Sequence, residues 1–347
     1  MRELSGRELN RALLARQLLV TRSRVPVVRA VERLVALQAQ YAPSPYLALW
    51  SRLENFRKEQ LTRALGRGSV VKAGLLRSTL HVVTRRDFPY VAAAYVDAQR
   101  GRIDNLGVDL QALAAAIPDR PVTSKELFEI AAGALGTDDR WTLSFALRGI
   151  PAARLPPVGP WPHHKPSPEL VWREPLPSAE DGALLVVRRY LAAYGPASRQ
   201  DVEQFTGFRL GQIDPALDRM RRLESSDGRV LFDIPRGLLP PEEMSVPVRF
   251  LPPYDSIILA HRDRSRILPD EYYELVIRRR NSTTLATFLV DGAVAGTWRV
   301  ERAKTSAVLR LAPFAPLPRR ARRELAEEGE RLIRFHEPEA DSYRVRG

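Results

Sequence analysis

The sequence predicts an α+β fold in which tandem winged-helix units are followed by a small C-terminal β-sheet or barrel. Apolar residues recur with helical spacing through most of residues 1–245, and short apolar runs after groups of helices predict β pairs. Several helices followed by a short β pair is the element order of a helix-turn-helix with a wing. From residue 246 onward apolar and polar residues alternate with a period of two, which is typical of strands.

Residues 1–100 are predicted to form the first unit. Ser5 and Glu8 have the spacing of a capping box at the start of a helix. Pro26 suits the first turn of a second helix, which must end before Pro43. The remaining elements are expected to be helices over residues 46–53 and 59–67 and strands over residues 70–72 and 80–83.

Residues 101–180 are expected to form a second unit of the same kind. Thr123 or Ser124 caps a helix, and residues 141–147 are a candidate recognition helix. The proline-rich stretch over residues 151–177 is either an extended wing or a linker. The tip of this stretch is basic and aromatic, which suits a DNA groove but also any exposed loop. Its residues are Trp161, His163, His164 and Lys165.

The clearest unit spans residues 181–245. An apolar helix stops at Gly195, Ser198 caps a short helix, and a third helix is expected over residues 211–223. A turn at Asp227-Gly228 then leads into a strand over residues 230–232. Three helices and a hairpin predict a winged helix whose recognition helix spans residues 209–222, although such a module can also serve protein contacts.

Residues 246–347 are predicted to form the C-terminal β domain. A tight Asp291-Gly292 turn joins two of its strands, and a helix over residues 324–335 follows the last of them. The strands are expected over residues 248–251, 257–260, 284–290, 293–300 and 307–311.

The charge of the chain favours a nucleic-acid partner. Lys and Arg number 54 against 41 Asp and Glu, a formal net charge of +13, and only five of these bases are lysine. The planar guanidinium of arginine suits phosphates and base edges, so double-stranded DNA is the expected partner. GC-rich coding also raises the arginine content, but it explains the excess of base over acid less well.

Composition excludes several classes of function. The chain has no cysteine, and its five histidines show no metal-site spacing, so we expect no disulfide, thiol nucleophile, metal or cofactor. No signal-peptide core and no apolar run of membrane-spanning length occur. We therefore expect a soluble, cytoplasmic protein without a membrane partner.

One polar residue falls where helical periodicity predicts burial. Gln38 lies in phase with Leu34 and Val35 on the apolar stripe of the second helix. A buried amide needs hydrogen-bond partners or costs a few kcal/mol. Gln40 falls on the opposite face of an ideal helix, unless the backbone unwinds before Pro43 and brings the two amides together. Gln38 therefore either bridges helix ends or belongs to a site that it shares with Gln40.

Longer stretches around these glutamines resemble a known family. Together they cover nearly the whole chain, which resembles the winged-helix family of AlkZ-like DNA glycosylases. Each stretch alone is a weak signal, whereas their combination is specific. The stretches are Ala30–Gln40, Ser44–Leu53, Leu76–Thr84, Leu251–Ala260, His261–Arg266 and Phe288–Arg299.

The resemblance implies a fold and an activity. It implies tandem winged helices arranged as a C-shaped clamp, with a C-terminal β domain. It also implies DNA repair by excision of N7-alkylated purines, including bulky adducts or interstrand crosslinks left by genotoxic natural products, and hence self-resistance to an antibiotic. The family's catalytic signature is a glutamine, an aliphatic residue, and a glutamine or aspartate. Gln38 and Gln40 match its double-glutamine form and are therefore the implied catalytic residues.

Such a role for two amides is chemically reasonable. Alkylation of purine N7 puts positive charge on the base, so its departure needs little help from a general acid. A neutral amide can orient water against the anomeric carbon, and two amides could fix both the water and the deoxyribose. Lysines are scarce, so we expect a monofunctional enzyme without a Schiff base, and the resemblance argues against deep extrusion of the base.

Seven further residues are candidates for contacts to DNA. Arg77 suits a phosphate or a structural carboxylate, and His81 suits either a polar core position or DNA. The basic run over residues 261–266 suits phosphate or groove contacts, or a solvated turn with an internal Arg–Asp pair. The candidates are Arg77, His81, His261, Arg262, Asp263, Arg264 and Arg266.

Two other functions stay open from the sequence. A non-enzymatic winged-helix protein, acting as a regulator or lesion-sequestering factor, would bind DNA without producing abasic sites. A scaffold that uses its winged helices for protein contacts would show no dependence on salt in DNA-binding assays. Binding led by phosphate contacts instead weakens steeply as the salt concentration rises. A clamp around one duplex is expected to act as a monomer, unlike a regulator that reads a palindrome as a dimer.

Overall fold

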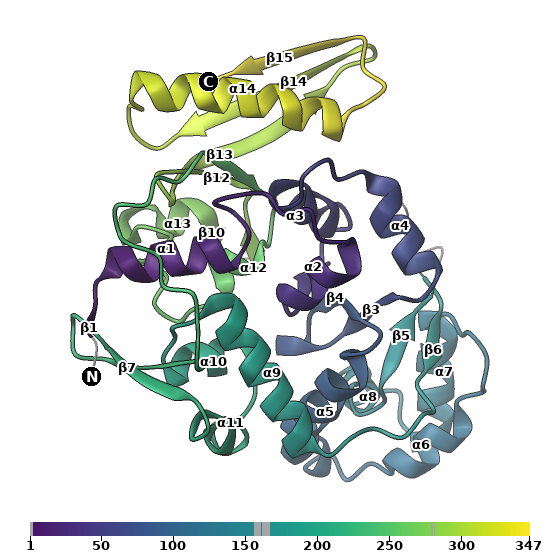
Figure 1. The fold of residues 1–347 in the computed structure, drawn as a ribbon. Coiled ribbons are helices and arrows are strands. Elements are labelled where there is room, and N and C mark those ends of the chain that lie inside the picture. Colours follow the sequence, from purple (N-terminus) through teal and green to yellow (C-terminus); the bar gives the residue numbers. More distant parts are fainter. Residues whose placement is uncertain (1–2, 156–160, 162–166, 279, 281) are drawn as a thin grey trace.

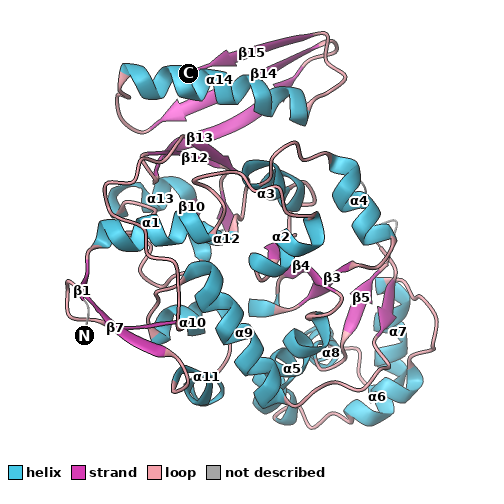
Figure 2. Cartoon of the chain, in the orientation of Figure 1, coloured by secondary structure: helices cyan, strands magenta, loops and turns pink. Residues whose placement is uncertain are grey.

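The computed structural model describes residues 3–155, 161, 167–278, 280 and 282–347. It is a mixed α+β fold, as predicted (Figure 1). Figure 2 shows helices concentrated in the middle and lower parts of the molecule, with the last strands forming a sheet at the top.

The N-terminal helices follow local signals only in part. α1 (Gly6–Arg16) begins with the predicted capping box of Ser5 and Glu8. α2 (Val27–Arg33) ends well before Pro43, so the prediction that Gln38 is helical is wrong. The backbone leaves the helix at Val35, whose φ is 68°, and then becomes extended. The next elements are β2 (Leu37–Gln38), α3 (Ser44–Arg52), α4 (Lys58–Gly66), β3 (Val70–Gly74), a 3-10 turn (Leu76–Ser78), β4 (Leu80–Thr84) and α5 (Phe88–Asp104).

A five-stranded antiparallel sheet connects the first segment with the second. Its order is β2-β4-β3-β5-β6, and the last two strands come from the proline-rich stretch. Trp161 is half-buried rather than part of an exposed tip, because its ring contacts Tyr46 and Lys58 Nζ lies 4.1 Å from its centre. His163, His164 and Lys165 lie outside the described residues. The elements are α6 (Leu110–Ala116), α7 (Ser124–Leu135), α8 (Arg140–Arg148), β5 (Ala152–Arg154) and β6 (Glu169–Val171).

The third segment has three helices and a hairpin in the predicted order. Its third helix is shorter than predicted, because residues after Leu217 turn away and form a strand. In that strand Leu223 is buried against Leu4 and Leu231, a contact that a helix would not make. The elements are α9 (Ala179–Tyr194), α10 (Arg199–Thr206), α11 (Leu210–Leu217), β7 (Arg221–Ser225) and β8 (Val230–Asp233), and β1 (Glu3–Leu4) pairs in parallel with β7.

The C-terminal segment forms an open sheet. Among the described residues its order is β15-β14-β13-β12-β9, and its ends do not meet, so the barrel alternative is wrong. Residues 256–259 form a helix where a strand was predicted, because Asp255 caps them by accepting from the Ile257 amide. The elements are β9 (Arg249–Leu251), α12 (Ser256–Leu259), a 3-10 turn (Asp270–Tyr272), α13 (Tyr273–Val276), β10 (Ile277–Arg278), β11 (Thr283–Thr284), β12 (Thr287–Val290), β13 (Ala293–Arg302), β14 (Ser306–Pro313), α14 (Arg319–His336) and β15 (Ser342–Arg346).

Three larger hydrophobic cores, besides the small one around Leu223, hold the described elements together. One core surrounds α9 and joins α1, α5 and α10 with residues 251–294. A second core lies between α2–α4 and the C-terminal sheet with α14. A third core is confined to residues 113–171 and is formed by α6, α7 and α8. The first and last parts of the chain are therefore built on shared apolar contacts.

The start of the chain is held by a turn near its end. Asn10 donates to the Gly292 carbonyl at 2.9 Å, and the buried Arg11 guanidinium pairs with Asp291 at 2.6 Å. The turn approaches α1 so closely that a Cβ on Gly292 would lie 2.6 Å from Leu14 Cδ1. Gly292 also has a φ of 83°, so both space and backbone conformation require glycine there.

A buried ion pair joins α3 to the loop before α12. Both guanidinium nitrogens of Arg52 contact the Asp255 carboxylate at 2.8 Å, and both side chains are almost fully buried. Arg52 also contacts the amide oxygen of Gln17, whose nitrogen donates to the Ala193 carbonyl in α9. One network thus ties together α1, α3, α9 and α12. Among the described residues no helix is both long and apolar enough to span a bilayer.

Replacing Arg52 by alanine is expected to lower the free energy of unfolding by about 3–5 kcal/mol, because Asp255 would be left as an unpaired buried carboxylate. Urea unfolding followed by circular dichroism measures the change. Arg24→Ala is the matched control, since Arg24 makes the same two-pronged contact with Glu54 on the surface. The control should unfold at nearly the wild-type midpoint. Equal losses in the two variants would contradict the importance assigned to burial.

Candidate active site

Gln38 is the last residue of strand β2, which pairs with β4, and Gln40 lies in the bend that follows. Gln38 is paired with His81, and the Ala39 amide continues the pairing by donating to the Leu80 carbonyl at 2.7 Å. The side-chain oxygen of Gln40 accepts from the Leu80 amide at 3.4 Å. The backbone is therefore extended rather than helical at Gln38, whose side chain is buried, whereas the side chain of Gln40 is exposed.

Strand register determines which residues share a face with Gln38. Residues directly opposite in antiparallel strands have side chains on the same face. His81 pairs with both Gln38 and Ala73, so these three side chains lie on the face toward α9. Leu37, Val82 and Lys72 pair in the next register and point to the other face.

This face holds polar atoms that lack partners. The Gln38 Oε1 and His81 Nε2 atoms are buried and make no hydrogen bond within the described part of the chain. His81 Nδ1 lies 3.0 Å from the Thr79 carbonyl, which can only accept, so Nδ1 carries the proton and Nε2 a lone pair. Burial, and secondarily the charge of Arg77, lowers the pKa of His81 to about 3, so the ring is neutral near pH 7. Buried acceptors without partners mark a place for water or a ligand.

The loop over residues 253–256 contacts the chain on both sides of the two glutamines, at Ala36 and at Ser44. Ser256 Oγ lies 3.5 Å from the Ala36 carbonyl, before the glutamines. Ser44 Oγ, after them, donates to the Pro253 carbonyl at 2.6 Å. The ion pair between Arg52 and Asp255 fixes this loop and thereby the position of the two amides.

Arg77 is half-buried and braces the site. Its guanidinium donates to the Phe205 carbonyl and lies 5.4 Å from the centre of the Phe205 ring. Its backbone has a φ of 53° and contacts Gly207, where a Cβ would lie 3.3 Å from Arg77 Cα. Burial lowers the pKa of Arg77 to about 10. The residue attaches the turn before β4 to α10.

Most of the basic run over residues 261–266 is also occupied inside the molecule. His261 is 1% exposed and contacts the Tyr194 carbonyl, and burial lowers its pKa to about 3. Asp263 pairs with Arg229 rather than within the run. Arg264 donates to the Tyr273 hydroxyl and Arg266 to the Pro196 carbonyl, each at 2.9 Å. Among the charged side chains of the run only that of Arg262 is exposed, so the run serves mainly to attach this loop to α9 and α10.

The predicted recognition helix is similarly engaged. The Arg209 guanidinium and the Gln212 amide both donate to the Asp97 carboxylate on α5, at 2.9 Å and 2.8 Å. Two polar side chains at the start of α11 are therefore engaged by α5, although Arg209 itself remains exposed.

A basic hollow that the sequence did not predict opens beside Gln40. Its volume is about 600 Å³, and the neighbouring Tyr41 lines it together with Tyr254. Arg278, Arg299 and Arg310 line it as well, brought from three strands. Arg299 and Arg310 share Glu301, whereas Arg278 is exposed and has no ion pair among the described residues. The only sequence signal was the arginine run at residues 278–280, because strand pairing alone gathers the others.

The fold is that of a DNA glycosylase of known structure. It superposes on Streptomyces sahachiroi DNA glycosylase AlkZ with a TM-score of 0.78, over 99% of this chain and 100% of that one. The two sequences are 18% identical, so this comparison shows a shared fold. The family model described as DNA glycosylase AlkZ-like matches residues 31–335, and the chain belongs to that family, as its motifs indicated. Among proteins with curated descriptions, none matches the sequence.

Acid is expected to destabilise the protein through its buried histidine. The unfolded chain binds a proton on His81 near the ordinary pKa of 6.5, whereas the folded chain does so only near pH 3. Above pH 6.5 His81 does not lower the free energy of unfolding. As the pH falls below 6.5, protonation of His81 in the unfolded chain lowers the free energy of unfolding, by about 2 kcal/mol at pH 5. The His81→Asn variant should lose about 2 kcal/mol less of its free energy of unfolding between pH 7.5 and pH 5 than the wild-type protein does. Urea titrations at both pH values measure it, and an unchanged loss would contradict the burial of a neutral ring.

Proposed function

We propose that the protein is a monofunctional DNA glycosylase that hydrolyses the N-glycosidic bond of N7-alkylated purines in double-stranded DNA. The observation that carries this proposal is the unpartnered, buried Oε1 of Gln38 next to Gln40, within a chain of the AlkZ-like family. Bulky natural-product adducts and crosslinks are the substrates that the family resemblance favours, with self-resistance as the biological role.

The reaction needs little from the protein beyond positioning. An N7-alkylated purine is cationic, so the C1′–N9 bond electrons leave with the base and neutralise it. Water then adds its oxygen to C1′ and releases a proton to solvent. Gln38 Oε1 can accept a hydrogen bond from that water and orient it, while the exposed Gln40 amide faces the deoxyribose. Positioning a reactant in this way accounts for a large part of the rate enhancement of many enzymes.

A Schiff-base mechanism is disfavoured by the placement of the lysines. Lys72 is the lysine in the same sheet, and burial lowers its pKa to about 8, which would suit a nucleophile. Its register opposite Val82 directs it to the other face from Gln38. An amine on that face is not positioned to attack C1′ of a nucleotide bound at the glutamines, and this supports a monofunctional enzyme.

We further propose that the duplex lies along the basic hollow lined by Arg278, Arg299 and Arg310. The hollow borders Tyr41, the residue after Gln40, so phosphates bound there would bring the lesion to the amides. The order α9, α10, α11, β7, β8 is that of a winged helix, and a clamp of such units acting as a monomer completes the proposal. In this proposed clamp, Arg262 is the arginine of the 261–266 run whose exposed side chain can contact DNA.

Gln38→Ala is expected to slow release of the modified base by about 10²–10³-fold, because the water would lose its orienting acceptor. The measurement is single-turnover release of N7-methylguanine from a duplex, with DNA affinity measured in parallel. Gln40→Ala should also impair release, and in both variants affinity should stay near the wild-type value. Gln111→Ala, an exposed glutamine on α6, is the matched control. Normal turnover by both site variants would show that the site is wrong, and binding without any release would favour a lesion-sequestering protein.

Arg278→Gln is expected to weaken binding to undamaged and damaged duplexes alike, and to reduce the salt slope of log K by about 1. Fluorescence anisotropy at several salt concentrations measures both quantities. Arg322→Gln removes the same charge from an exposed site on α14 and should leave the slope unchanged. If the two variants behave alike, the hollow is not the duplex site.

A further inference from the structure

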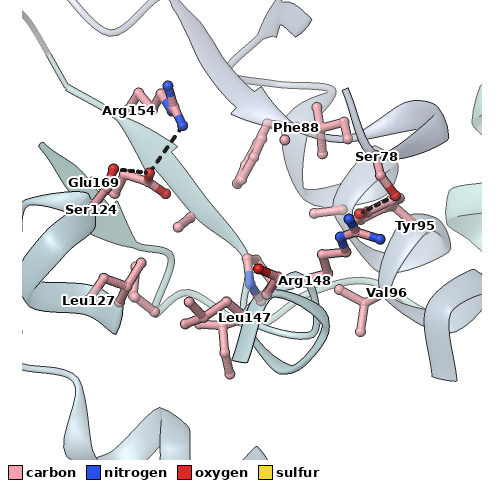
Figure 3. A pocket seen from close by; sticks show the side chains of 18 of the residues that line it. Ser78, Phe88, Tyr95, Val96, Ser124, Leu127, Leu147, Arg148, Arg154 and Glu169 are labelled. Carbon is pink, nitrogen blue, oxygen red and sulfur yellow. Dashed lines mark hydrogen bonds and ion pairs between the residues drawn. The ribbon is translucent and has the colours of Figure 1, made fainter. Parts of the chain in front are cut away.

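A separate pocket lies between the first and second segments of the chain. Its volume is about 330 Å³, at the lower end of the range for small-ligand sites. Figure 3 shows side chains from α5, α7, α8 and strands β5 and β6 converging on it. None of the residues proposed above for catalysis or DNA binding lines it.

The middle of the pocket is apolar and both of its ends are polar. Phe88 and Val96 of α5 face Leu127 of α7 and Leu147 of α8 across the middle. At one end Glu169 pairs with Arg154 at 3.3 Å and contacts the Ser124 hydroxyl at 3.2 Å. That end is therefore already neutralised.

The other end carries an uncompensated charge. Tyr95 donates to Ser78 Oγ at 3.1 Å, and Figure 3 shows the Arg148 side chain beside this pair. Arg148 is half-buried, and its guanidinium lies 4.1 Å from the centre of the Phe145 ring. No carboxylate in the described part of the chain pairs with it. The lining thus has two guanidinium groups against one carboxylate, a net charge of +1.

We propose that this pocket binds a small carboxylate carrying an aromatic or other apolar group. The carboxylate would pair with Arg148 and accept from the Ser78 hydroxyl, and the apolar group would fill the space between Phe88 and Leu147. A partly desolvated guanidinium pairs with an anion more strongly than one in water does. The acid is either a free small molecule or an acidic substituent of a DNA lesion, and the experiment separates these two sources.

The test is calorimetric titration of the full chain with trans-cinnamate and with its neutral analogue, cinnamamide. Cinnamate should bind with a Kd on the order of 0.1–1 mM, and cinnamamide at least tenfold more weakly. Arg148→Gln should abolish the preference for the acid, whereas Leu147→Trp should weaken both ligands by filling the apolar middle. Lys125→Gln, which removes an exposed charge from α7 outside the lining, should bind like wild type. Thermal melts confirm that each variant is folded.

Two results would overturn the proposal: no saturable binding of cinnamate by wild type, or a preference for the acid that survives in Arg148→Gln. A competition experiment then identifies the source of the acid. If the acid belongs to a lesion, cinnamate should inhibit release of an N7-guanine adduct with an acidic aromatic substituent, but not release of N7-methylguanine. If it is a free molecule, neither release should be inhibited. The binding result does not depend on glycosylase activity, so either proposal can fail without the other.

Discussion

The buried ion pair between Arg52 and Asp255 is the contact on which the geometry of the site depends. It holds the loop over residues 253–256, which in turn contacts the chain just before and just after the two glutamines. Through Gln17 the same network reaches α1 and α9. The stretch over residues 251–260 therefore has a structural role, although it contains none of the proposed catalytic residues.

Local signals in the sequence predicted local structure well. The capping box at Ser5 and the helix cap at Ser198 act within a few residues, and the structure has both where they were expected. The wrong predictions of secondary structure include places where contacts with distant segments determine the conformation. Nothing near Gln38 indicates that α2 ends at Arg33, because the strand exists only through its pairing with β4. The apolar run at Ile257 was ambiguous between strand and helix, and the cap supplied by Asp255 decided it.

Of the candidate site, the two glutamines could be predicted from the sequence better than the charged residues could. The glutamines were found because their spacing in the chain matches the family's motif. The charged residues could not be found in this way. His261 and Arg266 look like surface residues in the sequence, yet the Tyr194 and Pro196 carbonyls bind them in the interior. The arginines of the hollow are instead gathered from separate strands, so the number of arginines indicated a DNA partner without showing which of them face it.

The contact between α1 and the Asp291-Gly292 turn has a consequence for biosynthesis. The hydrogen bond from Asn10 to Gly292 spans 282 residues of sequence. At the usual speed of translation, about 5–20 residues per second, the first helix leaves the ribosome about 15–60 s before its partner turn has been made. For that time the apolar side of α1, including Leu13 and Leu14, lacks part of its final cover. The nascent chain therefore has a long interval in which chaperones can act, and a ribosome that stalls before residue 291 leaves a product whose N-terminal helix lacks this contact.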